Sequence, residues 1–174
     1  MNKLLIILLF LLCNPKLYAQ QFLGKSGEIS FFSETPMEDI SAVNKKVSAV
    51  YDAITTDLIF RLKITDFIFP KALMQEHFNE NYLESDLYPT STFVGKVLEI
   101  KDNQSVVKGD LKIHGKTNQI VVVGSLIRKE GFVNIKADFS IKLEDYNITV
   151  PKIVMYKIAE VIDIEVNIKL KEIR

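Results

Sequence analysis

Alternation of apolar and polar residues is the feature that most constrains the fold of this chain. It is clearest in residues 161–171, where isoleucine, valine and leucine alternate with acidic, amide and basic residues. Successive side chains of a β-strand point to opposite faces, so this pattern predicts a strand with one buried face. The same reasoning predicts strands at residues 28–33, 40–51, 57–64, 92–100, 105–114, 119–128 and 132–141.

The connections between these strands are short and contain turn-forming residues. Residues 102–103 (Asp-Asn) mark a turn, and residues 115–118 are predicted to form a hairpin loop in which Gly115 takes a positive φ. Residues 45–46 indicate a turn or bulge, and Gly95 a bend. About eight strands with hairpin connections favour an antiparallel sheet, and closure into a barrel would remove its edges. The predicted fold is therefore an all-β, closed antiparallel barrel.

One helix is predicted to interrupt the strands, at residues 71–83. Met74, Phe78 and Tyr82 follow one another at intervals of four, which places them on one apolar face. Another face is predicted to be solvated and carries three glutamates: Glu76, Glu80 and Glu84. A single amphipathic helix among strands is expected to cover or plug the barrel that they form.

The first 19 residues are interpreted as a secretory signal peptide, which leaves residues 20–174 as one domain. Lys3 precedes the apolar run 4–12, which is too short to span a membrane, and Ala19 offers a small residue for cleavage. The product is expected to be periplasmic or secreted. Cys13 leaves a lipoprotein open as an alternative, although Leu12 before it is large for that kind of signal.

The sequence carries little that indicates catalysis. Basic and acidic residues number 22 each and form no basic stripe, which argues against a nucleic-acid partner. The only cysteine lies in the predicted signal peptide, and no nucleophile elbow, phosphate loop or dinucleotide fingerprint occurs. His77 and His114 are interpreted as polar residues at the barrel rim. We therefore expect no enzyme activity, no cofactor and no metal.

Aromatic residues favour binding instead. The chain has 11 Phe, 6 Tyr and no Trp, and several of them lie in or beside the predicted helix. Any single aromatic residue could simply fill the core. Together, aromatics before, within and after a helix over a barrel mouth are suited to lining a cavity.

Four stretches of the chain carry recognisable sequence elements: YPTSTF at residues 88–93, His77-Phe78 with Tyr82-Leu83 before it, GDLKIHGKT at residues 109–117, and residues 159–166. In this order they resemble the YPxxTF element, the positions that precede it, the hairpin and the closing strand of the YceI-like family of bacterial periplasmic proteins. The resemblance implies a lipocalin-like barrel with an aliphatic chain along its axis. A polyisoprenoid, a fatty acyl chain or amide, and a quinone-like isoprenoid stay open as ligands.

The predicted function is a non-enzymatic carrier that holds one long apolar chain inside the barrel. The alternative is a structural or interaction module of the cell envelope whose barrel is filled by its own aromatics. Transient membrane contact and a homodimer are left open. The candidate ligand-binding residues are Phe67, Phe69, Met74, His77, Phe78, Tyr82, Leu83, Phe93, Ile113 and Phe139.

Overall fold

The computed structural model describes residues 20–34, 39–149 and 159–173. The predicted signal peptide and Cys13 lie outside these residues. The strands are β1 (Gln21–Ser33), β2 (Ile40–Asp52), β3 (Asp57–Lys63), β4 (Thr90–Lys101), β5 (Gln104–Ile113), β6 (Lys116–Lys129), β7 (Phe132–Lys142) and β8 (Val161–Ile173). The helical segments are η1 (Ile64–Asp66), α2 (Ala72–His77), η2 (Phe78–Tyr82) and η3 (Glu144–Tyr146). In the described part of the chain, no helix is long and apolar enough to cross a membrane.

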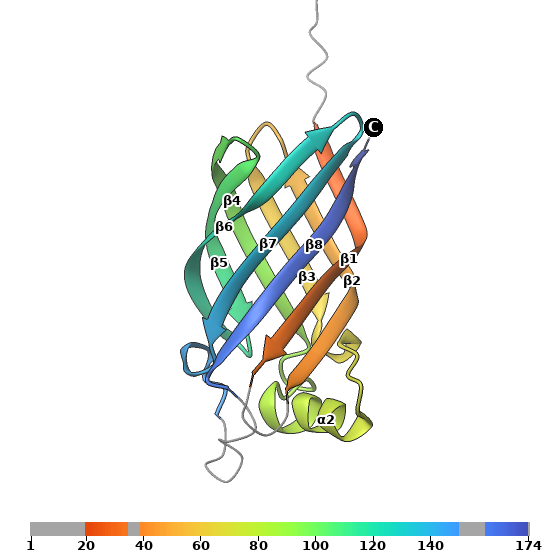
Figure 1. The fold of residues 1–174 in the computed structure, drawn as a ribbon, viewed down its shortest axis with the longest axis vertical. Coiled ribbons are helices and arrows are strands. Elements are labelled where there is room, and N and C mark those ends of the chain that lie inside the picture. Colours follow the sequence, from red (N-terminus) through yellow and green to blue (C-terminus); the bar gives the residue numbers. More distant parts are fainter. Residues whose placement is uncertain (1–19, 35–38, 150–158, 174) are drawn as a thin grey trace, which may run out of the picture.

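The strands form one closed antiparallel barrel in chain order, which confirms the predicted fold (Figure 1). Closure comes from the antiparallel pairing of β1 with β8. Helix α2 lies at one end, here called the helix end (Figure 1). The other end carries the β2–β3, β4–β5 and β6–β7 connections and is called the turn end. Strand β1 begins at Gln21 rather than at residue 28, because Gly24 and Gly27 obscure the alternation that Phe22 begins.

The β5–β6 connection is tighter than the sequence indicated. Ile113 pairs with Lys116, so the turn has two central residues, His114 and Gly115, and the predicted loop over residues 115–118 is wrong. Both central residues have positive φ, 49° at His114 and 75° at Gly115. Two positive φ values are what a type I′ turn requires, and this turn matches the twist of the paired strands.

We predict that Gly115→Val destabilises the barrel by about 1–3 kcal/mol, the cost of holding a bulky residue in a sparsely allowed backbone region. Gly115 has the predicted positive φ, and a Cβ atom there would lie 2.5 Å from Cε1 of Tyr88. Urea denaturation measures the change. Gly131→Val is the matched control, because it has a similar φ of 72° but no atom near the added Cβ. Equal losses in both variants would mean that the Tyr88 contact contributes nothing.

Two further predictions about the strands have different outcomes. Residues 45–46 form a bulge, as expected: Gly27 pairs with Val47 and Ile29 with Asn44, which leaves one extra residue on β2. Gly95, predicted to mark a bend, pairs in regular register with Gly109, and the bulge of β4 lies further along, between Val97 and Glu99. A Cβ on either glycine would lie 2.6 Å from Cζ of Phe93. The glycine pair therefore makes room for the Phe93 ring.

The half of the barrel near the turn end is filled by its own side chains. This filled half consists of Phe22, Ala49, Tyr51, Leu58, Val97, Val107, Leu126, Val133, Ile135, Ile168 and Leu170. Val133 and Leu170 are completely buried, and the ring of Phe22 stacks on Tyr51 with 6.2 Å between centroids. The guanidinium of Arg128 lies 5.3 Å from the Phe22 centroid and donates a hydrogen bond to Gln20. Arg128 therefore covers the aromatic stack at this end.

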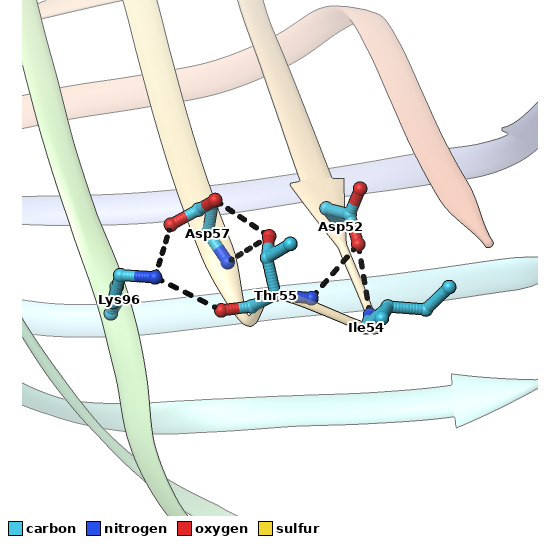
Figure 2. Close-up of polar contacts among 5 residues, drawn as sticks. All are labelled: Asp52, Ile54, Thr55, Asp57 and Lys96. Atoms are coloured by element: carbon cyan, nitrogen blue, oxygen red, sulfur yellow. Dashed lines mark hydrogen bonds and ion pairs between the residues drawn. The ribbon is translucent and has the colours of Figure 1, made fainter. Parts of the chain in front are cut away.

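Polar contacts secure the β2–β3 connection at the same end (Figure 2). Asp52 accepts hydrogen bonds from the backbone N–H groups of Ile54 and Thr55, at 2.8 and 3.1 Å. Lys96 of β4 pairs with Asp57 at 2.9 Å and donates to the Thr55 carbonyl. Hydrogen bonds from the Thr55 backbone, the Gln21 side chain and the Ile54 backbone hold the pKa of Asp52 below its ordinary value. The carboxylates of Asp52 and Asp57 therefore stabilise the β2–β3 turn.

One seam of the barrel is only partly hydrogen-bonded. The β6–β7 ladder runs from Lys129 and Phe132 to Gly124 and Ala137, where it ends. From there to the helix end, residues 116–123 of β6 pair with β5, while residues 138–142 of β7 pair with β8. Side chains rather than backbone hydrogen bonds must therefore hold β6 and β7 together near the helix end.

Candidate functional site

The predicted helix is present but changes type along its length. It begins as α-helix at Ala72 and continues as π-helix over Phe78–Tyr82, with the Leu83 N–H bonded to the Phe78 carbonyl. Neither part contains a fully buried residue. A helix that packed into a solid core would bury its apolar face. Its half-buried face therefore indicates a space beneath it.

A cavity of about 590 Å³ occupies that space, between the helix and the filled half. All ten candidate ligand-binding residues line it: Phe67, Phe69, Met74, His77, Phe78, Tyr82, Leu83, Phe93, Ile113 and Phe139. The predicted face of Met74, Phe78 and Tyr82 thus looks into the barrel, while Glu76 and Glu80 are exposed. The volume falls within the usual range of ligand pockets, about 300–1,000 Å³.

Four phenylalanines meet where the helix approaches the barrel wall. Phe78 packs against Phe31, Phe67 and Phe69, with ring centroids 5.5, 5.6 and 4.9 Å away. Phe31 was missed among the candidates, although it alternates with Ile29 and Ser33, which also line the cavity. Phe31 could have been found from the alternation of residues in its own strand. Offset and edge-on packing of this kind adds to what burial alone contributes.

The cavity wall is almost entirely apolar. Aliphatic side chains from β6, β7 and β8 complete it: Ile120, Val122, Ile135, Ile141, Ile162, Ile164 and Val166. Burial raises the pKa of the Tyr82 phenol, so this group stays neutral. Lys71 and His77 also line the cavity, and both are exposed on the helical segment. Within the described ranges, no three His, Cys, Asp or Glu side chains are placed to hold a metal ion.

His114 lies in the β5–β6 turn at the rim of the barrel, as interpreted, but it is largely buried there. Its side chain is only 9% exposed, with Nε2 2.7 Å from Oε2 of Glu84 and Nδ1 3.1 Å from the Tyr146 carbonyl. Glu84 lies beyond the helix with a positive φ and is half-buried, so it does not belong to the solvated face that its spacing predicted. The ring also packs edge-on against Tyr88. His114 therefore ties the β5–β6 turn to the segment after the helix and to η3.

An antiparallel barrel that is packed at one end and has an apolar cavity at the other has the architecture of the lipocalin-like barrels. The family model of the YceI-like domain matches residues 19–170, and the chain belongs to this family. No curated relative matches the chain.

Solved structures share the fold at low sequence identity. A polyisoprenoid-binding domain from Saccharophagus degradans, implicated in plant cell wall breakdown, is 12% identical with a TM-score of 0.76; the match covers 89% of this chain and 99% of that domain. BcnA from Burkholderia cenocepacia is 16% identical with a TM-score of 0.73, over 82% and 95% of the two chains. The YceI protein of Campylobacter jejuni is 18% identical with a TM-score of 0.67, over 81% and 90%.

Proposed function

We propose that this protein is a non-enzymatic carrier that holds the apolar chain of one lipid in the cavity beneath the helix. The observation that carries the proposal is the cavity itself, about 590 Å³ enclosed by aromatic and aliphatic side chains. The description of the Saccharophagus degradans domain as polyisoprenoid-binding supports the same class of ligand. A wall with few polar groups suits a chain and gives little means of recognising a headgroup deep inside.

Burial of the chain would supply the affinity. Each methylene removed from water contributes about 0.8 kcal/mol, so twelve contribute about 10 kcal/mol. Association costs of at least about 4 kcal/mol oppose this gain. Micromolar binding, about 8 kcal/mol, therefore requires about fifteen buried carbons or additional contacts at the mouth. The alternative, a barrel filled by its own side chains, accounts for the filled half but does not account for the cavity.

Native mass spectrometry of the protein purified from its own host tests the proposal. We expect a bound species whose extra mass is that of a long-chain lipid or isoprenoid, released when the protein is denatured. A clean apo mass, together with no binding of a fluorescent long-chain fatty acid in titration, would contradict the carrier. The protein would then be better described as an interaction module.

We also propose that the protein is exported, on the strength of the apolar run at residues 4–12. The denatured mass from the same sample reads the N-terminus directly. A chain that begins near Gln20 is expected. A chain that begins at an acylated Cys13 would make the protein a lipoprotein, and an uncleaved chain in the cytoplasm would refute export.

A further inference from the structure

The cavity ends inside the barrel. Leu58, Val107 and Ile135 both line the cavity and belong to the filled half, so they mark the boundary between the two. Behind them, Leu126 is 4% exposed and Val133 0%. The Phe22–Tyr51 stack and Arg128 close the far end. A lipid chain that enters from the helix end therefore meets packed side chains, here called the floor of the cavity.

The volume above this floor sets a limit on chain length. A water molecule occupies about 30 Å³ of liquid, and a methylene group fills nearly the same volume, so the cavity of about 590 Å³ holds about twenty such groups. We propose that the floor is a chain-length stop, and that the preferred ligand is a single-chain lipid with about twenty carbons in its apolar chain, the size of four isoprene units. This inference rests on the proposed carrier function and deepens it.

Two positions in the protein allow the cavity to be made shorter or longer by substitution. Ala137 lines the cavity next to Ile135, opposite Gly124 on the last rung of the β6–β7 ladder. Ala137→Leu adds three carbons to the cavity, whereas Ile135→Ala removes three from its floor. Val123→Leu is the control, since Val123 is 55% exposed on the outer face of β6.

Binding of saturated fatty acids of about 10 to about 28 carbons, delivered from lipid vesicles, read by native mass spectrometry and referred to the aqueous concentration of each acid, measures the stop. For the unaltered protein, affinity should rise about fourfold with each added carbon up to about twenty and then level off, because further carbons stay outside the cavity. Ala137→Leu should move this break to chains shorter by about three carbons, and Ile135→Ala to chains longer by about three. Val123→Leu should leave it in place.

Different failures have different meanings. Affinity that rises without a break to the longest chains, or a break that neither Ala137→Leu nor Ile135→Ala moves, overturns the stop while leaving the carrier intact. Absence of binding at every chain length overturns the carrier itself. Ala137→Leu fills space rather than opening it, so it keeps the test decisive even where Ile135→Ala does not fold.

Discussion

Phe78→Leu is expected to weaken the binding of a fluorescent long-chain fatty acid far more than it lowers the Tm. Phe78 lines the cavity and makes three aromatic contacts, each worth about 0.5–1.5 kcal/mol beyond burial. Leucine keeps most of the apolar volume but loses these ring contacts, so a limited loss of stability accompanies the change in shape of the cavity roof. Phe78→Ala should reduce both, with a stability loss below the 3–5 kcal/mol typical of a fully buried Phe, because Phe78 is only half-buried.

The matched control is Phe132→Leu, the same substitution at the turn end, where Phe132 packs beneath the Lys169 ammonium at 4.1 Å. It should leave lipid binding unchanged. Fluorescence titration gives the dissociation constant, and thermal unfolding followed by circular dichroism gives the Tm. A fall in Tm with no change in binding would show that Phe78 merely fills the core, and the helix would be a plug.

Tyr146→Ala is expected to destabilise the protein by about 3–5 kcal/mol, the range for a large buried aromatic residue. Tyr146 is 2% exposed and packs at the helix end, near the unpaired parts of β6 and β7. Two hydrogen bonds fix η3 there: Asn118 of β6 donates to the Asp145 carbonyl at 2.6 Å, and His114 contacts the Tyr146 carbonyl. No ladder hydrogen bonds join the strands at this point, so loss of the ring should loosen the seam.

Tyr146→Phe is the control, since it keeps the ring and removes only the hydroxyl. Urea denaturation compares the two variants, and hydrogen exchange of the amides in residues 116–123 reports on the seam itself. We expect faster exchange in Tyr146→Ala than in Tyr146→Phe. Equal stability in both variants would mean that η3 rests on the barrel without holding it closed.

Much of the barrel could be predicted from the sequence because strand alternation is a local property. A residue pattern of period two determines which side chains face inward, whatever the neighbouring strand is. The same holds for the apolar face of the helix, since Met74, Phe78 and Tyr82 do line the cavity. Phe31 shows the limit of this reasoning: its strand was predicted, but its contact with Phe78 joins β1 to a helix 47 residues later.

The contact between His114 and Glu84 could not be predicted from their surroundings in the sequence. Helical spacing grouped Glu84 with Glu76 and Glu80, but the helix ends first, and the positive φ of Glu84 turns the chain toward His114. The number of residues in the β5–β6 turn was equally hard to predict, because a positive φ is uncommon for any residue other than glycine, and at His114 it is accompanied by contacts with three residues distant in sequence.

The sequence by itself determined the barrel class, the order of strands and the inward-facing residues, because these follow from periodicity and turn chemistry. Only the tertiary structure decided which part of the interior is filled and which is hollow. Inward-facing apolar residues look alike in sequence, whether they meet each other, as Phe22 and Tyr51 do, or surround a space, as Phe78 and Phe139 do. That difference depends on side-chain volumes summed across strands and on the height at which the helix crosses the mouth.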